Sequence, residues 1–249
     1  YTLWHTLSLH DALPISLTKA ARRLKSFGII SGLVKQQLQD DWEGTLTQLA
    51  DWGYEELEFS GYYGSSEAAF RAKLQELGIR AIAGGSSLSN LQKNLELYVE
   101  EALFFFFFYV VCYWPWLHSG DTIQLEDIHY AIEEFNRIGA ICKARGLTFA
   151  FHNHDKEFYP VNGHIPYELF LQGTDPDLVK MEIDLYWIHK GGGDVLDYFE
   201  RFPGRFPICH VKDATADRDF ACVGEGVLDF ATLFRKGKKA GLQHFIVER

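Results

Sequence analysis

Four side chains capable of binding a metal follow β-rich runs in the second half of the chain. They are Glu157, Asp184, His210 and Glu248, within the segments FHNHDKEF, MEIDLYW, ICHVKD and IVER. Each gap between them is long enough for a strand, a helix and two loops. Three carboxylates and one imidazole that converge would form a site for a hard divalent cation. The sequence therefore predicts metal-assisted chemistry if the fold brings these four residues together.

The elements that must position these residues alternate between β-rich runs and amphipathic segments. This pattern is typical of βα units and a parallel sheet. The predicted strands are residues 28–33, 55–61, 79–84, 106–112, 147–154, 179–186, 206–213 and 244–249. The clearest predicted helices are residues 42–53, 65–78, 89–103, 125–146 and 230–241.

Glycines punctuate this pattern at the ends of predicted helices. Gly53, Gly78, Gly146 and Gly241 each precede a β-rich run, and glycine readily adopts the left-handed conformation that ends a helix. Eight strands favour a closed (β/α)8 barrel of the α/β class, a TIM barrel, although an open doubly wound sheet has the same local signature. No G-x-G-x-x-G or G-K-[ST] loop follows a strand, which argues against nucleotide binding. We interpret Gly191–Gly193 as a flexible loop.

Composition narrows the class of protein without naming a substrate. The 249 residues suit one barrel domain, and the net charge of −10 argues against a nucleic-acid partner. The four cysteines form no C-x-x-C pair, so we expect free thiols in a reducing, cytoplasmic compartment. The apolar run 103–116 is too short to span a bilayer. We interpret it as a buried strand and expect no membrane partner.

The two ends of the chain differ from the regular pattern. LSLHDALPIS (7–16) resembles translated sequencing-adapter read-through, so we treat residues 1–18 as a non-native segment and residues 19–249 as the barrel domain. The chain stops at Arg249, where a full barrel would continue with a helix. The expected barrel is therefore one that lacks its final helix.

Alternation along the strands predicts which polar groups share a face. Residues i and i+2 point the same way, so His152 pairs with His154 and His210 pairs with Lys212. A buried charge costs several kcal/mol unless it is paired or bound to a metal. A single Asp or His at a strand end is usually a cap or a satisfied core group. Four consecutive strands that all deliver polar groups at one end favour a functional site instead.

Taken together, the motifs resemble those of a known family. From about Gly28 to Arg249 the chain resembles the sugar phosphate isomerase/epimerase family, the xylose-isomerase-like TIM barrels. The motifs that carry the resemblance are residues 42–64, 151–158, 181–192, 202–213 and 223–234, and the closing HFIVER. They cover nearly all of the chain after residue 18.

The resemblance implies roles for individual residues. Glu157, Asp184, His210 and Glu248 match the four metal ligands of the family. His152 and His154 match substrate-contacting or acid/base histidines, and Lys212 matches a contact to substrate oxygens. Glu58 is a weaker candidate for the same site. On the residues alone, we interpret Glu182 as an ion-pair partner and Tyr186 and Trp187 as wall residues, with Tyr186 contacting substrate.

The chemistry implied is proton abstraction next to a carbonyl through a metal-stabilised enediolate. We expect an isomerase or epimerase acting on a keto sugar or polyol, with Glu157 and Glu248 as an acid/base pair that also binds metal. The ligand set suits Mn²⁺, with Mg²⁺ or Co²⁺ as alternatives. Because no phosphate-binding loop is evident, we favour a non-phosphorylated substrate. Relatives are often dimers or tetramers, so a homo-oligomer is compatible with the resemblance.

Three alternatives remain open from the sequence. A lyase or dehydratase acting on a 3-keto sugar or inosose would share the same enolate and expel a leaving group. A metal-dependent endonuclease on the same barrel would favour more histidine ligands and a basic face, which the net charge contradicts. The third alternative is a non-catalytic or inactive barrel fragment.

Overall fold

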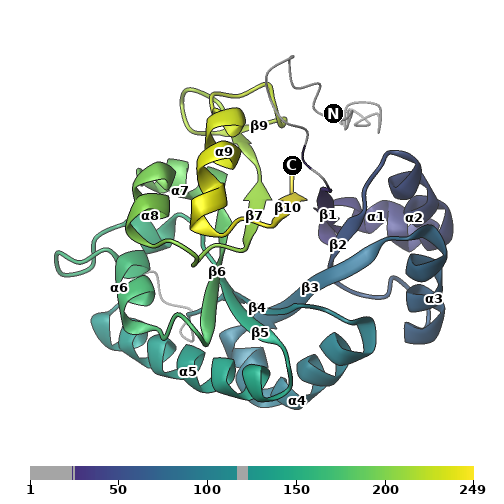
Figure 1. Cartoon of the computed structure of the whole chain (residues 1–249), viewed down its shortest axis with the longest axis horizontal. Helices are drawn as coiled ribbons and strands as arrows, with labels where there is room; N and C mark the ends of the chain where they lie inside the picture. Colours follow the sequence, from purple (N-terminus) through teal and green to yellow (C-terminus); the bar gives the residue numbers. More distant parts are fainter. Residues whose placement is uncertain (1–23, 25, 117–122) are drawn as a thin grey trace, which may run out of the picture.

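The computed structural model describes residues 24, 26–116 and 123–249, and eight parallel strands within them form a closed barrel (Figure 1). The strand order around the barrel is β1-β10-β7-β6-β5-β4-β3-β2. The strands are β1 (Gly28–Ile30), β2 (Glu56–Phe59), β3 (Arg80–Ser87), β4 (Tyr109–Trp114), β5 (Thr148–His152), β6 (Val179–Asp184), β7 (Ile208–Val211) and β10 (His244–Val247). All eight predicted strands, and the predicted TIM barrel, are confirmed.

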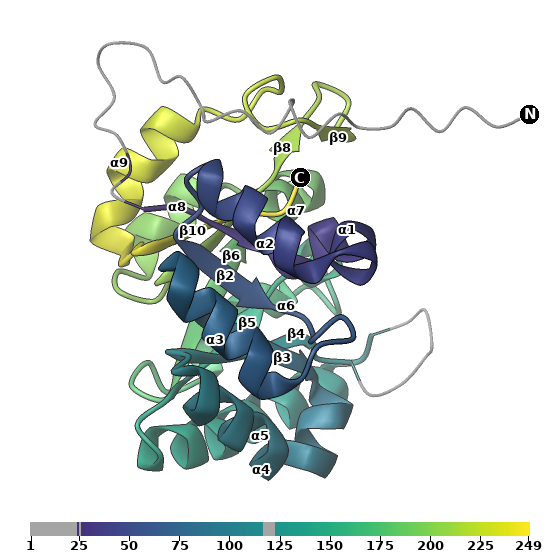
Figure 2. The same cartoon turned by 90° about the vertical axis from the view of Figure 1, so that its right-hand side faces the viewer.

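Helices surround the barrel and connect successive strands (Figures 1 and 2). They are α1 (Lys35–Asp40), α2 (Trp42–Asp51), α3 (Glu67–Leu77), α4 (Leu88–Phe105), α5 (Leu125–Ala144), α6 (Pro166–Gly173), α7 (Leu185–Gly191), α8 (Val195–Arg201) and α9 (Phe230–Ala240). Two short 3-10 helices, η2 (Ser31–Val34) and η3 (Lys156–Phe158), follow β1 and β5. A two-stranded antiparallel hairpin, β8 (Asp213–Ala214) with β9 (Phe220–Ala221), follows β7. The four short helices α1, α6, α7 and α8 were not predicted, because six to eight residues carry little periodic signal.

Side-chain alternation divides the core into two parts. One cluster fills the inside of the barrel and includes Val111, Ala150, Ile208 and Ile246. The larger cluster lies between the sheet and the helices. Consecutive strand residues point to opposite faces, so the inward positions of β7 after Ile208 are His210 and then Lys212. The same alternation that packs the core therefore aims polar residues at one end of the barrel.

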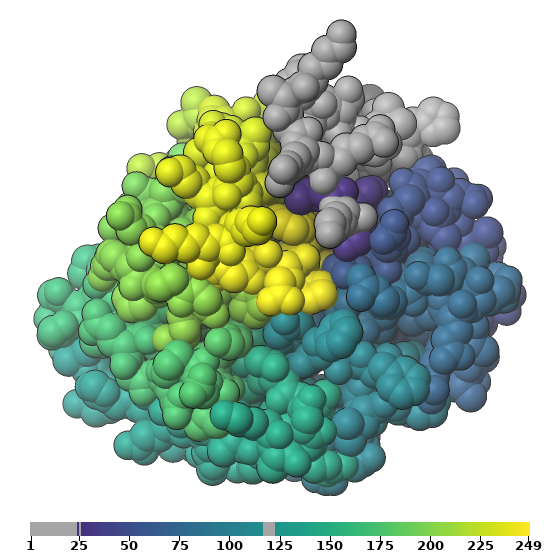
Figure 3. Space-filling model, viewed as in Figure 1, coloured from purple at the N-terminus to yellow at the C-terminus, as the bar shows by residue number. Residues whose placement is uncertain are grey.

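The barrel closes where the first strand meets the last. Gly28 pairs with Ile246, and the C-terminal residues lie against this strand in the space-filling view (Figure 3). A Cβ atom at position 28 would be 2.6 Å from Ile246 Cδ1 and 2.8 Å from the Glu56 main-chain oxygen. Glycine is required here because the neighbouring strands leave no space for a side chain.

Three predictions about local structure are corrected or lie outside the described residues. The apolar run 103–116 is not one buried strand: it ends α4, turns at Phe106 with φ of 60°, and becomes strand only at Tyr109. An apolar run without periodicity cannot distinguish helix from strand. The glycine run is also not a loose loop, because Gly191 ends α7 and Gly192 is its left-handed cap. Residues 1–18 lie outside the described residues.

The predicted helix-ending glycines are confirmed. Gly53, Gly78, Gly146 and Gly241 all have positive φ, and Gly78 and Gly241 are the C-caps of α3 and α9. Among the described residues, no helix combines the length and the apolar character needed to cross a membrane.

Candidate metal centre

Polar side chains from four adjacent strands converge at the C-terminal end of the barrel. His152 ends β5, Asp184 ends β6, His210 lies on β7, and Glu248 follows β10. One ligand atom from each of these four residues lies within 4.8 Å of the ligand atoms of the other three. A second group with the same property consists of Glu58, Glu182 and His210. The two groups share His210, so they form one continuous polar cluster.

Strand register and a helix cap explain this convergence. Asp184 is level with His210 in the β6–β7 pairing, and His152 is level with Glu182 in the β5–β6 pairing. Asp184 is also the N-cap of α7, and its Oδ1 accepts a hydrogen bond of 2.8 Å from the Trp187 backbone N–H. The cap bond fixes the carboxylate and leaves Oδ2 for another partner. The short helix α7 therefore helps to build the site.

His210 is the centre of the cluster. Its Nδ1 lies 2.8 Å from Glu248 Oε2 and its Nε2 lies 2.6 Å from Glu58 Oε2. Lys212 extends the network, with Nζ 2.8 Å from Glu248 Oε1 and 3.5 Å from Asp184 Oδ2. These charges are almost fully buried: Glu58, Asp184 and His210 are at most 1% exposed. Only Glu248 retains appreciable exposure, with 27% of its side chain accessible.

Burial and neighbouring charges shift the pKa values in this cluster. Burial, reinforced by the charge of His210, lowers the pKa of His152 to about 3, so this imidazole is neutral. Burial raises the pKa of Asp184 to about 7 despite the nearby Lys212. Burial alone would raise the pKa of Glu248, but hydrogen bonding and the charges of His210 and Lys212 lower it. For His210, burial is outweighed by the carboxylates of Glu58 and Glu182, which raise its pKa.

The cluster has the donors that a divalent cation needs. Asp184 Oδ2, Glu182 Oε1 and Glu58 Oε1 are buried and accept no hydrogen bond, although Lys212 Nζ and His210 Nε2 lie 3.5 Å from the first two. Buried polar atoms are normally satisfied, so three carboxylate oxygens without hydrogen bonds in one place are donors available to a cation. A neutral imidazole at His152 is the form that binds metal. The residues present therefore fit a divalent cation of the Mn²⁺, Zn²⁺ or Mg²⁺ type.

Glu157 is the one predicted ligand that the structure does not bring to the other three. It lies on η3, beyond the end of β5, and belongs to neither group of ligand atoms. Its Oε1 accepts a hydrogen bond of 3.0 Å from Trp116 Nε1, and its Oε2 accepts one of 2.6 Å from the His154 backbone N–H. Burial raises its pKa to about 7. Glu157 holds the turn after β5, and His152 is the residue of this segment whose ring lies close to the other three predicted ligands.

The other predicted residues do lie at this end of the barrel. Glu58 and Lys212 are part of the cluster, as described above. The ring of His154 is 4.9 Å from that of His152 and 5.4 Å from that of Trp187, and its Nδ1 has no hydrogen-bond partner. Tyr186 lies in the first turn of α7, where Lys212 Nζ is 5.8 Å from its ring. Tyr186 is fully buried next to Lys212, and its contact with substrate stays a prediction.

Two residues of the predicted motifs have positions that sequence reasoning missed. Asn153, between the two histidines, accepts from the Asp184 backbone N–H at 3.0 Å and donates to its carbonyl at 3.4 Å, which ties β5 to β6. Glu182 contacts both His152 (3.2 Å) and His210 (3.5 Å), so it is an ion-pair partner as expected and also a member of the second ligand group. The sequence signal for Glu182 was its position two residues before Asp184 on the same strand, which puts both side chains on one face.

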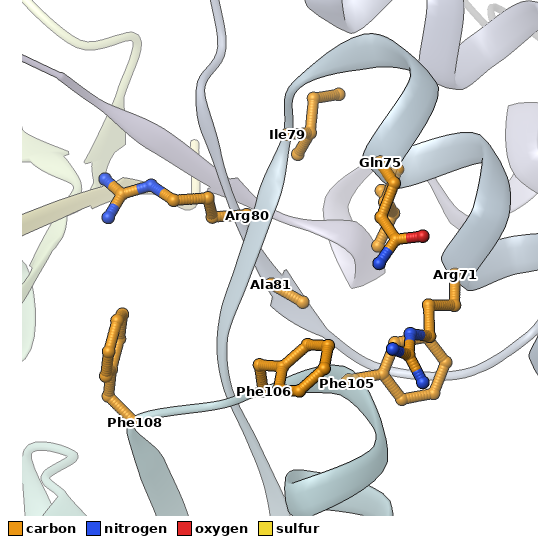
Figure 4. Close-up of a pocket in the computed structure, with 9 residues that line it drawn as sticks. Arg71, Gln75, Ile79, Arg80, Ala81, Phe105, Phe106 and Phe108 are labelled. Atoms are coloured by element: carbon orange, nitrogen blue, oxygen red, sulfur yellow. The ribbon is translucent and has the colours of Figure 1, made fainter.

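A separate hollow of about 190 Å³ lies elsewhere, where β3 begins. It is lined by residues of α3, β3 and the α4–β4 turn, including Arg71, Arg80, Phe106 and Phe108 (Figure 4). None of the predicted site residues lines it. The arrangement that could support a reaction is therefore the polar cluster and not this apolar hollow.

Comparison with known proteins agrees with the fold and with the general chemistry. The chain is 24% identical to an inosose dehydratase of Geobacillus kaustophilus over 83% of this chain and 78% of that protein. A sugar phosphate isomerase/epimerase structure from Parabacteroides distasonis matches with a TM-score of 0.77 and 25% identity, covering 95% of this chain and 90% of that one. An IOLI protein with a bound zinc atom has the same fold, with a TM-score of 0.72 and 16% identity, covering 90% of this chain and 88% of that one.

The family model for xylose isomerase-like TIM barrels matches residues 108–249. That range is more than half of the 249 residues and contains every member of the polar cluster except Glu58. The matched relatives include both isomerase/epimerase and dehydratase enzymes. The chain belongs to the xylose isomerase-like TIM barrel family.

Proposed function

We propose that this protein is a metal-dependent lyase that removes water from a keto polyol of the inosose type. The proton next to the carbonyl is removed first, and the hydroxyl on the following carbon then leaves. The observation that carries this proposal is one carboxylate, Glu248, that belongs to the four-residue ligand cluster and is paired with one ammonium group, Lys212. The likeness to an inosose dehydratase over most of both chains supports the substrate class.

The metal ligands in this proposal are His152, Asp184, His210 and Glu248. The unpartnered oxygen of Asp184 and the neutral state of His152 support this set. A divalent cation held there would stabilise negative charge on the substrate oxygens. Mn²⁺, Mg²⁺ and Co²⁺ suit the donors, and the zinc atom in the IOLI relative adds Zn²⁺ to the candidates.

Glu248 is the proposed base. Its side chain is the most exposed among the four ligands, so it is the one that a substrate can reach most easily. An ionised carboxylate accepts a proton from carbon when the resulting charge is stabilised. Lys212 Nζ donates to Glu248 Oε1 at 2.8 Å, which orients the carboxylate. The same ammonium group can protonate the departing hydroxyl. The carboxylate that removes one proton and the ammonium group that delivers another are therefore neighbours.

The geometry supports elimination better than epimerisation. Epimerisation needs a second acid/base group on the opposite face of the carbon. Glu157, expected to be that group, has both oxygens occupied by Trp116 and His154. Glu58 and Glu182 are completely buried and contact His210 and His152. Elimination requires one base and one acid, which Glu248 and Lys212 provide.

Product analysis tests the proposal. Purified protein loaded with Mn²⁺ is incubated with an inosose and, separately, with D-fructose. We expect loss of one water from the inosose, detected by mass spectrometry, and no such loss with Glu248→Gln. Glu200→Gln, at an exposed position of α8, is the matched control and should retain activity. Unchanged dehydration by Glu248→Gln would contradict the assignment.

Isomerisation or epimerisation of a keto sugar is the second candidate. It is favoured by the Parabacteroides distasonis relative, which is described as a sugar phosphate isomerase/epimerase and covers 95% of this chain. In this case a ketose recovered from D₂O would carry deuterium and would have lost no water. The two candidates share the first proton transfer and differ only in the fate of the enolate.

A further inference from the structure

A buried carboxylate outside the ligand cluster organises the loop above it. Asp213 follows Lys212 in the chain and is 1% exposed. Its side chain accepts four backbone hydrogen bonds and, within the described residues, forms no ion pair. The donors are the N–H groups of Ala214 (2.8 Å), Gly224 (2.9 Å), Gly226 (3.0 Å) and Leu228 (3.2 Å). We call this arrangement the Asp213 clamp.

The G-x-G sequence at positions 224–226 is explained by the clamp. Gly224 has φ of 91°, a conformation that other residues seldom adopt. A Cβ atom on Gly226 would lie 2.3 Å from Asp213 Oδ1 and 2.3 Å from the Ala214 carbonyl oxygen. Both glycines therefore let the backbone wrap closely around the carboxylate. The motif forms a turn that binds a carboxylate, and glycine is needed there because the backbone must approach Asp213 closely.

The clamp holds the β8–β9 hairpin, which carries Phe220. The Phe220 ring stacks on Tyr186 at 4.2 Å between centroids and contacts Trp187 at 5.6 Å. The centroid of the same ring lies 4.6 Å from the Arg249 guanidinium carbon and 5.4 Å from Lys212 Nζ. Figure 2 shows β8 and β9 at the same end of the molecule as α7 and the C-terminal residue. Phe220 thus completes an aromatic wall next to the Lys212–Glu248 pair.

We propose that Phe220 is a specificity-determining residue for the substrate and that Asp213 is the positioning residue that sets its place. This inference rests on the proposed function for the chemistry at Glu248. The C–H face of a polyol would pack against the partly exposed rings of Phe220 and Trp187, with the buried Tyr186 ring behind Phe220, while its oxygens meet the cluster. Trp187 comes from α7, and Phe220 comes from a hairpin whose position depends on one carboxylate.

A purely structural role for Asp213 makes different predictions. If the clamp only stabilised the whole barrel, its loss would lower the melting temperature. Below that temperature the hairpin of the variant would then be no more accessible than that of the wild type. If it positions the hairpin, its loss should expose the hairpin locally while the barrel stays folded. Arg218 lies exposed in this hairpin and provides a tryptic cleavage site. Cleavage after Arg218 therefore reports the clamp directly.

The first measurement uses limited trypsin digestion of the folded chain without substrate or metal. Asp213→Asn and Gly226→Ala should each speed cleavage after Arg218 by about tenfold or more, because charged hydrogen bonds are lost or displaced. Asp229→Asn is the matched control: this exposed carboxylate accepts from the Thr232 N–H at the start of α9 and does not contact the hairpin. Cleavage rates equal to wild type in both clamp variants would overturn the positioning role.

The second measurement tests Phe220. Phe220→Leu should weaken binding or raise KM for an inosose by roughly 3- to 10-fold while kcat changes less, since aromatic packing is lost and Glu248 is untouched. Phe234→Leu, on α9 where the ring packs against Phe245 of β10, should leave KM unchanged. An unchanged KM in Phe220→Leu would overturn the specificity role. A wild-type protein that binds no inosose or ketose would contradict the proposed function, and the clamp would still be judged by its cleavage rates.

Discussion

Both ends of the barrel interior contain a buried histidine–glutamate contact, and the same two strands contribute to both. Strand β2 supplies Glu56 at one end and Glu58 at the other. Strand β10 supplies His244 at the first end, and Glu248 follows it at the second. The residue types are the same, yet their hydrogen-bonding states differ. That difference separates structural from functional polar groups in this protein.

At the N-terminal end the polar groups are satisfied. Glu56 accepts from Arg80 and Ser26 through Oε1, and its Oε2 lies 3.0 Å from His244 Nδ1. At the C-terminal end, oxygens of Glu58, Glu182 and Asp184 are buried without a hydrogen-bond partner. A polar network whose buried atoms are all hydrogen-bonded stabilises the fold, whereas a network with unsatisfied buried oxygens indicates a place for a ligand. The apolar hollow near Arg80 also has no buried unpartnered polar atom among its lining residues.

The largest expected effect separates the two ends by activity. Glu248→Gln should lower dehydration by roughly 10³-fold, since a general base contributes about 10²- to 10⁴-fold. Glu56→Gln, at the opposite end, should leave kcat/KM of the folded protein within a fewfold of wild type. Steady-state rates of the two Mn²⁺-loaded variants make the comparison. Equal losses at both ends would remove the distinction.

Stability should show the opposite order. Glu56→Ala leaves His244 without its carboxylate partner, and breaking such a buried pair costs about 3–5 kcal/mol in free energy of unfolding. Glu58→Gln in the metal-free protein should cost less, because the glutamine oxygen can still accept a hydrogen bond from His210 Nε2. Burial and the nearby Glu182 charge already disfavour the ionised carboxylate, which raises the pKa of Glu58. Urea unfolding of the metal-free variants measures both values, and a larger cost for Glu58→Gln would contradict this interpretation.

Metal affinity should distinguish His152 from Glu157. His152→Ala removes a proposed ligand and should weaken Mn²⁺ binding by about 100-fold. Glu157→Gln keeps the turn and should weaken it by only about tenfold, the lower end of the effect expected for a residue that supports metal ligands. Calorimetric titration with Mn²⁺ measures both. A stronger effect of Glu157→Gln would restore the assignment expected from the sequence.

The smallest expected effect is a pH dependence of metal binding. Burial raises the pKa of Asp184 to about 7, so below pH 7 its carboxyl is increasingly protonated in the metal-free protein. A cation must displace that proton and also the proton that the raised pKa of His210 retains, so Mn²⁺ affinity should rise with pH across the whole range and more steeply below pH 7. Titrations between pH 5.5 and 8 test this, and Asp184→Asn should bind weakly with a flatter profile. An affinity that is constant across this range would exclude Asp184 as a ligand.

Much of the fold was predictable because its signals are local. Each strand carries a β-rich run and several helices end at glycine, so the eight strands follow from patterns within short windows, and their number favoured a closed barrel over an open sheet. The errors arose where a short window holds no periodicity. The phenylalanine run at 103–108 is helix, turn and connection, and the helices α6, α7 and α8 are too short to show a repeat.

Residue types and strand alternation were enough to predict Asp184, His210, Lys212 and Glu248 as one polar group at the strand ends. They were not enough to choose between His152 and Glu157, because both lie in FHNHDKEF and both are metal ligands by type. That choice depends on where β5 ends and on the bonds that Trp116 and the His154 N–H make to Glu157. The Asp213 clamp likewise joins residues up to 15 positions apart. Whether a buried oxygen accepts a hydrogen bond depends on which atoms surround it in space. Only the tertiary structure therefore decides which buried carboxylate oxygens have a hydrogen-bond partner and which have none.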